Sequence, residues 1–187
     1  GMINVSVLFQ LTSDDKSTEK LLKQKVCKTL FLLWMNLLRI PNCTLFLFFS
    51  SPDMETLKIN LRKVSPNNFD ETFRAIIRII KMSDYCRLKE FCLIEGGVQV
   101  DEYLPFVEEL CYFLKQRASK LVKLHLPVAS NSCLTTISAM PSLQCLVIER
   151  TRHLNYDGLL KLCDDKSSTK YLLQVLHIGK IINLFTV

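Results

Sequence analysis

The sequence has little glycine and proline, with 5 Gly and 6 Pro among 187 residues. It contains neither G-x-G-x-x-G nor G-x-x-x-x-G-K-[ST], the glycine-rich loops that bind dinucleotides and nucleoside triphosphates. Its most apolar region, residues 30–49, is interrupted by Asn36, Arg39, Pro41 and Asn42, so it falls short of the ~18 uninterrupted apolar residues of a spanning helix. We therefore expect neither a phosphate-loop enzyme nor a membrane-spanning chain.

Metal-binding cysteine spacings are also missing. None of the eight cysteines forms a C-x-x-C pair, and no histidine follows a cysteine pair at a zinc-finger interval. Most cysteines lie inside apolar runs, such as Cys92 and Cys145, where a reduced cysteine behaves as a small buried hydrophobic residue. We expect free thiols, no metal, no cofactor and a reducing compartment, the cytoplasm with the nucleus as a further location.

Charge is nearly balanced. Lys and Arg exceed Asp and Glu by 24 − 18 = 6, and the lysines of residues 16–28 are interleaved with Asp14, Asp15 and Glu19, which is typical of a solvated helix face. We expect no nucleic-acid partner; binding to RNA or a membrane surface through this stretch stays an alternative that a steep salt dependence would reveal. No Cys or Ser stands in a local pattern with His and an acid, so we expect no enzyme and no small-molecule substrate.

Leucine is what the chain has in excess, at 32 of 187 residues. From residue 54 onward many of these leucines follow the spacing L-x-x-L-x-L, and the five units start 34, 33, 22 and 30 residues apart. The units are Met54-Leu57-Ile59, Leu88-Phe91-Leu93, Leu121-Leu124-Leu126, Leu143-Leu146-Ile148 and Leu173-Leu176-Ile178.

Segments with helical periodicity separate the units. Apolar residues share one face in residues 69–80 and 104–114, a short connection spans 133–140, and a further helix is expected over 156–163. Before the units, alternation over residues 3–11 predicts a strand, and Leu22, Val26, Leu30, Leu33 and Leu37 predict a long helix over 14–39. A strand, a turn and a returning helix make a right-handed crossover, so the strands should be parallel and the stacked units should bury the leucines between strands and helices.

These units resemble the leucine-rich repeat superfamily, especially its long intracellular α/β repeats, as in ribonuclease inhibitor and the receptor subunits of ubiquitin ligases. The resemblance implies an α/β fold: a short, irregular solenoid of parallel strands and outer helices over residues 54–187, capped by a strand and a helix in residues 1–53. The family usually has Asn or Cys after the third leucine and two further residues. Here those positions hold Gly96, Ala129, Thr151 and Ile181, so we expect an absent or irregular turn ladder. An ordinary α/β domain with a parallel sheet remains the alternative fold.

The resemblance implies a non-enzymatic protein-interaction module with its partner on the concave strand surface. As a ligase receptor or adaptor, it would dock its adaptor through residues 14–40. That segment lacks an F-box start, and Leu22 to Cys27 misses an elongin-binding box by one residue. The strand columns beside the leucines are mixed in polarity and show no charge stripe. The candidate partner-binding residues are Lys58, Asn60, Glu90, Cys92, Lys123, His125, Glu149, Arg150, Arg152 and His177.

The sequence leaves one alternative function open and contains an apolar segment near its C-terminal end. A small α/β enzyme or ligand-binding domain stays open as an alternative, and it would need a deep pocket with converging polar groups and perturbed pKa values. The apolar segment 171–187 would leave an open strand edge. We expect a protein partner, a second copy of the chain or further sequence to cover it.

Overall fold

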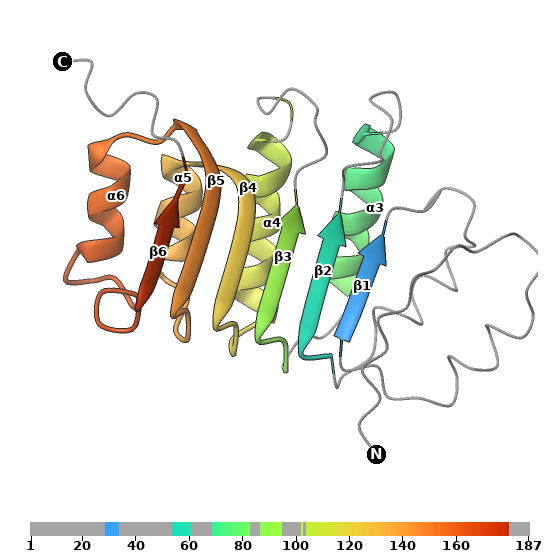
Figure 1. The fold of residues 1–187 in the computed structure, drawn as a ribbon, viewed down its shortest axis with the longest axis horizontal. Helices are drawn as coiled ribbons and strands as arrows, with labels where there is room; N and C mark the ends of the chain where they lie inside the picture. The colour runs from blue at the N-terminus through green and yellow to red at the C-terminus, as the bar shows by residue number, and fades with distance from the viewer. Residues whose placement is uncertain are drawn as a thin grey trace, which may run out of the picture.

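A computed structural model describes residues 29–33, 54–60, 69–82, 87–94, 102 and 104–179, with only the backbone given for 29–33. The core of the fold is one sheet of six parallel strands that follow one another in chain order (Figure 1). The strands are β1 (Thr29–Leu33), β2 (Thr56–Asn60), β3 (Glu90–Ile94), β4 (Lys123–Ser130), β5 (Cys145–His153) and β6 (Val175–Ile178).

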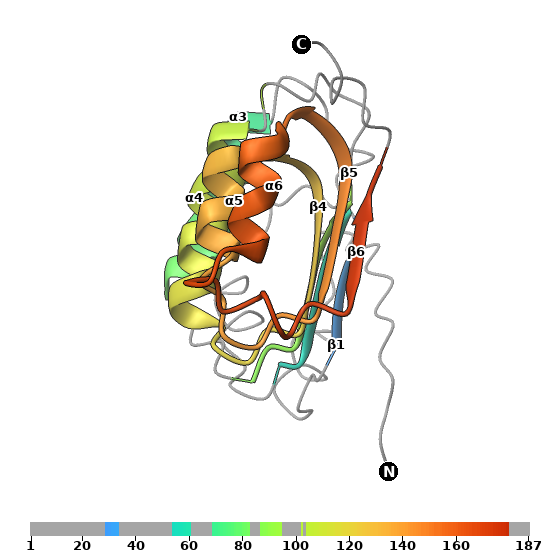
Figure 2. The same ribbon diagram turned by 90° about the vertical axis from the view of Figure 1, so that its left-hand side faces the viewer.

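Four described helices lie together on one face of this sheet, and none of the described elements covers the other face (Figure 2). They are α3 (Phe69–Met82), α4 (Leu104–Arg117), α5 (Asn131–Ile137) and α6 (Tyr156–Cys163). Each helix connects two neighbouring parallel strands, as a crossover connection must. The α/β fold predicted from the sequence is therefore confirmed, and the face without helices is called the open face below.

The strand register aligns the predicted leucine triplets. Leu57 pairs with Phe91, Phe91 with Leu124, Leu124 with Leu146, and Leu146 with Leu176. The triplet residues of the first four units are at most 2% exposed and form one core with the inner faces of the helices. Apolar side chains at equivalent positions of successive strands thus produce the continuous core that the leucine excess predicts.

The backbone repeats from unit to unit as well. The carbonyl of Glu55 accepts hydrogen bonds from the N–H groups of both Lys89 and Glu90. The same two-donor arrangement recurs at the carbonyls of Lys89, Val122 and Gln144, each receiving two successive N–H groups of the next unit. Units of unequal length therefore enter the sheet in the same way, because the variation lies between the strands.

The predicted helix over residues 14–39 is wrong at residues 29–33, which form β1, parallel to β2. The prediction rested on leucines at helical spacing, but the short apolar run over residues 29–33 is equally compatible with a buried strand. Leu30 pairs with Leu57 and Leu32 with Ile59, so Cys27, Leu30 and Leu32 repeat the triplet spacing one unit earlier. The rest of that helix and the strand predicted over 3–11 lie outside the described residues.

Two asparagines form a short ladder between neighbouring units, away from the positions at which the sequence predicted an absent or irregular one. The Asn131 amide nitrogen donates to Asn155 Oδ1 at 2.8 Å, and the Asn155 N–H donates back to Asn131 Oδ1 at 3.2 Å. Asn155 also caps α6 by accepting from the Gly158 N–H at 3.0 Å. Ala129 and Thr151, at the positions where the family has Asn or Cys, are buried; the ladder residues lie two and four positions further along the chain.

Candidate interaction face

Alternation along the strands determines which side chains reach the open face. Because neighbouring residues of a strand point to opposite faces, the residues beside each buried leucine face away from the helices. The register makes Lys58, Cys92, His125, Val147 and His177 one row across five strands, as the sequence predicted. A second row on the same face lies two residues closer to the N-terminus of each strand. It contains Thr56, Glu90, Lys123, Cys145 and Val175.

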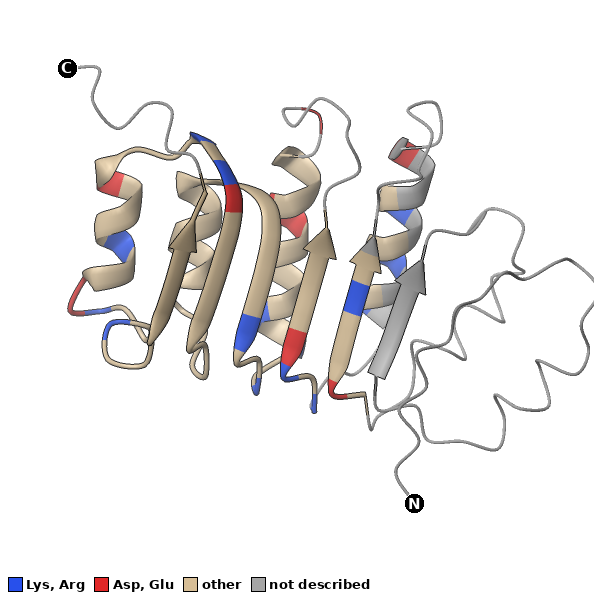
Figure 3. Cartoon of the chain, viewed as in Figure 1, with Lys and Arg blue, Asp and Glu red and all other residues tan. Residues whose placement is uncertain are grey.

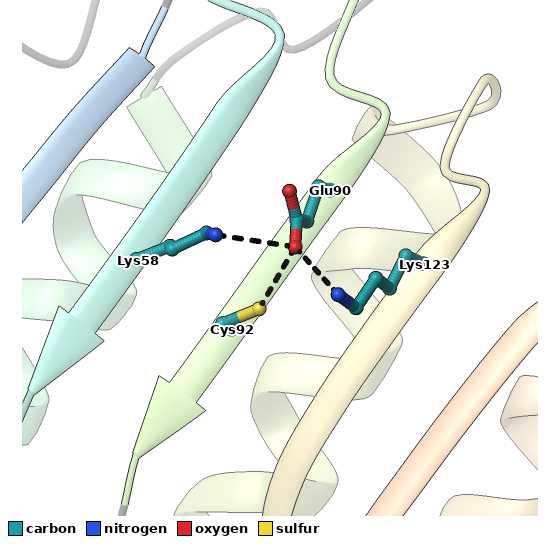
Figure 4. A network of polar contacts seen from close by, with 4 residues as sticks. All are labelled: Lys58, Glu90, Cys92 and Lys123. Carbon is teal, nitrogen blue, oxygen red and sulfur yellow. Dashed lines mark hydrogen bonds and ion pairs between the residues drawn. The ribbon is translucent and has the colours of Figure 1, made fainter.

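Charged residues from three neighbouring strands meet on the open face (Figure 4). The Glu90 carboxylate lies 3.4 Å from Lys58 Nζ on β2 and 2.9 Å from Lys123 Nζ on β4. The Cys92 thiol, two residues along β3, donates a hydrogen bond to the same carboxylate oxygen at 3.5 Å. One carboxylate is thus shared by two cations and a thiol, and we call these four residues the Glu90 network.

Contacts within the Glu90 network shift the pKa values of Glu90, Cys92 and Lys123. Partial burial acts to raise the pKa of Glu90, but the hydrogen bond from Lys123 and the charges of Lys123 and Lys58 outweigh it and leave that pKa below 4.5. Burial and the adjacent negative charge raise the pKa of the Cys92 thiol to about 11. Lys123 has a raised pKa, chiefly because of its hydrogen bond to Glu90. At neutral pH the Glu90 carboxylate and Lys123 are therefore charged and the Cys92 thiol is protonated, so Cys92 is a poor nucleophile.

A second polar pair lies on the next strands. His125 Nε2 of β4 is 2.8 Å from Glu149 Oε1 of β5, and both side chains are partly buried. The two residues are diagonal neighbours, because His125 pairs in register with Val147, two positions before Glu149. Side chains of this length bridge such diagonal positions.

The remaining predicted residues are more scattered. Arg150 and Arg152 lie in the C-terminal half of β5. Figure 3 colours basic residues blue, and blue segments are visible near the top of this strand. His177 lies on β6, the last described strand, and its side chain is exposed. Asn60 ends β2, and its side chain lies outside the described part of the structure. The structure therefore joins six of the ten predicted residues into two contact groups.

The prediction of no charge stripe concerned the columns that begin at Lys58 and Asn60; the opposite charges of Glu90 and Lys123 lie in the row that begins at Thr56. Lys58 occupies the position after the second residue of its triplet, whereas Glu90 and Lys123 occupy the position before it. Aligning the position before the second leucine in each unit places Glu90 beside Lys123. The signal was present in the sequence, but it required pairing across strands rather than inspection of single columns.

Two thiols lie on the helix side, between α4 and α5. Cys111 and Cys133 are buried, and a hydrogen bond from Cys111 lowers the pKa of Cys133 to about 7, against the opposing effect of burial. The same hydrogen bond, followed by burial, raises the pKa of Cys111. Ser130 Oγ caps α5 by accepting from the Cys133 N–H at 3.2 Å and donates to Glu108 at 2.5 Å. These contacts hold α5 against α4 inside the core.

The described residues contain no group of three or more His, Cys, Asp and Glu side chains that could hold a metal ion. His125 and His177 are two strands apart in the register, roughly 10 Å at ~4.8 Å per strand. The five described cysteines are free thiols.

Comparison with known proteins found no match to this chain among protein-family models, curated proteins or solved structures. None of the described helices is long and apolar enough to cross a membrane.

Proposed function

We propose that this protein is a non-enzymatic protein-interaction module, a short leucine-rich-repeat-like stack that binds a protein partner on its open face. One observation carries the proposal: five strands in register present polar side chains on a sheet face that no described element covers. Such a face is broad and built on rigid elements, as a protein-binding surface requires.

The repeat character supports the stack. Equivalent triplets occupy equivalent buried positions, and four successive carbonyls accept the same pair of N–H groups. A repeat protein stabilises itself by contacts between neighbouring units and leaves its strand surface available for binding. The irregular unit lengths fit the degenerate form of the leucine-rich repeat that the sequence resembles.

The chemistry of the open face favours a partner with charges of both signs. Glu90 is flanked by two lysines, and Glu149 accepts from His125. These groups are already paired, so a partner gains most by adding apolar contact around Cys145 and Val147 and polar contacts at the rim. Complementary charges would mainly accelerate association and set the orientation of the complex.

A substrate-receptor or adaptor subunit of a ubiquitin ligase is the specific role we propose for this module. β1 narrows the segment that could dock an adaptor, because residues 29–33 belong to the sheet. An adaptor-binding helix would have to come from the residues that precede β1. The free thiols among the described cysteines suit a reducing compartment, and we propose the cytoplasm, with the nucleus as a further location.

The test is affinity purification from the native cell with three forms of the protein. The wild type is compared with the double charge reversal Lys58→Glu/Lys123→Glu on the open face and with Arg74→Glu/Arg78→Glu on the exposed face of α3. We expect a protein recovered with the wild type and the α3 variant but lost with the open-face variant. Equal recovery with all three would refute the open-face site, and recovery of ligase adaptors decides the receptor role.

A further inference from the structure

The C-terminal end of the stack exposes an apolar surface. Among the described residues, six of the seven large hydrophobic side chains that are exposed lie between residues 156 and 176; Tyr112 of α4 is the seventh. They come from α6, from the turn after it and from β6, which lie together at one end of the sheet (Figure 1). We call this surface the end face: Tyr156, Leu160, Tyr171, Leu172, Val175 and Leu176.

The end face is the cross-section of the core. Leu176 occupies the strand position of Leu57, Phe91, Leu124 and Leu146, all of which are fully buried, yet Leu176 is 46% exposed. In the inner units the next strand and helix cover this position. Within the described residues β6 pairs only with β5, so its second edge presents backbone N–H and C=O groups next to apolar side chains.

We propose that the end face binds the end face of a second copy of this chain, forming a two-fold symmetric dimer. A two-fold axis perpendicular to the sheet sets the two β6 strands antiparallel at their free edges and keeps both helix layers on the same side. The two α6 helices then lie antiparallel, with Tyr156 and Leu160 of each facing the other. A two-fold interface uses the same patch on both copies, so apolar side chains and strand edges are complementary by symmetry.

Charge placement favours this antiparallel arrangement. Arg152 lies near the end of β5, just before α6 begins, whereas Asp164 directly follows α6, and both are exposed. The two-fold axis brings Arg152 of one copy to the end of α6 where the partner's Asp164 lies. Within α6 itself, the acidic first turn with Asp157 faces the partner's last turn with Lys161. Parallel α6 helices would instead align like charges.

Sedimentation velocity of the purified 187-residue chain, up to about 100 µM, tests the dimer. Leu160→Glu and Val175→Glu place a charge on side chains that are already 45% and 51% exposed, so the fold should tolerate them while the interface should not. We expect a wild-type dimer whose dissociation constant rises by about tenfold or more in each variant. Tyr112→Glu, on a side chain 52% exposed but outside the end face, is the matched control and should leave the dimer unchanged.

A charge reversal tests the two-fold geometry. Arg152→Asp and Asp164→Arg should each weaken the dimer, and the double variant should restore it, because the reversed pair is again complementary. Concentration-dependent protection of the β6 and α6 amides in hydrogen exchange provides a second readout that does not depend on any variant.

Three outcomes overturn the proposal. A monomer throughout the concentration range, with β6 amides already protected, would show that another segment of the chain covers the end face. A dimer insensitive to Leu160→Glu and Val175→Glu would place the interface elsewhere. A dimer that the double charge reversal fails to restore would exclude the antiparallel arrangement.

Discussion

Glu90 shows how a single residue organises the open face. It reaches a lysine on each neighbouring strand, and its own strand adds the Cys92 thiol (Figure 4). The row containing Lys58, Cys92 and His125 followed from the sequence, because the leucine triplets establish which residues share a strand position. Glu90 and Lys123 also share a row, so their proximity follows from the aligned triplets. The Lys58–Glu90 ion pair joins residues of two different rows, and it did not follow from the sequence because spacing does not give the reach of a side chain.

Glu90→Gln should lower the free energy of unfolding by ~0.5–1 kcal/mol at neutral pH, a value kept small because the site is partly solvated. The folded pKa of Glu90 is lowered from 4.5, so its contribution is fully present above that pH. It is lost as the pH falls below 4.5 through the folded pKa. Urea unfolding of both proteins across this range should therefore show their difference shrinking only on the acid side.

Glu55→Gln is the control for this prediction, because Glu55 forms one exposed ion pair with Lys89 at 3.4 Å. We expect its effect to be smaller than that of Glu90→Gln. A Glu90→Gln difference that stays constant from neutral pH to well below pH 4.5 would contradict the assigned ion pairs.

Gly158 and Asn131 depend on each other. A Cβ at residue 158 would lie 1.9 Å from Asn131 Oδ1, so Gly158→Ala must displace the Asn131 side chain and break its contacts with Asn155. We expect a loss of about 1–2 kcal/mol in thermal or urea unfolding. In an Asn131→Ala background the same substitution should cost much less. Equal costs in both backgrounds would show that the ladder is not what requires glycine.

Among the elements, helical periodicity located α3, α4 and α6. The segment 133–140 was predicted only as a short connection, whereas α5 covers Asn131–Ile137, and residues 29–33 of the predicted helix over 14–39 form a strand. The segment predicted over 156–163 is α6 with the same ends, and the apolar faces predicted for residues 69–80 and 104–114 pack inward in α3 and α4. The sequence did not predict β1, because a five-residue segment that is mostly apolar is too short for its periodicity to distinguish a strand from a helix. In the structure, residues 29–33 form a strand because they pair with β2. The residues of β2 lie further along the chain, so a local window of sequence does not contain this pairing.

The burial of the five described thiols predicts the order in which they react. Cys163 is exposed at the end of α6, and Cys145 is half-buried on the open face. Cys92 is buried and belongs to the Glu90 network, and Cys111 and Cys133 lie in the core between α4 and α5. Under native conditions, alkylation followed peptide by peptide with mass spectrometry should modify Cys163 first and Cys145 next.

Cys92, Cys111 and Cys133 should react only at the rate of local or global opening. Denatured protein is the control, in which all five described thiols should react together. Rapid native alkylation of Cys111 or Cys133 would contradict the packing of α5 on α4.

At the scale of the whole molecule, the leucine excess is explained by stacking. The parallel sheet, the outer helices and the alignment of the triplets could be predicted because every unit repeats the same spacing. The exposure of the last unit could not be predicted residue by residue, because it depends on what covers the final strand.

Leu146 and Leu176 make this difference measurable. They are paired residues of neighbouring strands, but Leu146 is fully buried and Leu176 is 46% exposed. Leu146→Ala should lower the free energy of unfolding by ~2–5 kcal/mol because it leaves a cavity. Leu176→Ala should cost only ~1 kcal/mol in dilute protein. Equal costs in urea unfolding would mean that the last unit is covered in the isolated chain.

Site-specific photo-crosslinking in cells reports directly whether a protein partner contacts the open face. A photoreactive residue replaces either Val147, between His125 and His177 on the open face, or Arg74, exposed on α3. In native cells we predict a defined crosslinked protein from position 147 and none from position 74. A product from position 74 alone, or no product from position 147, would refute binding of a protein partner at the open face.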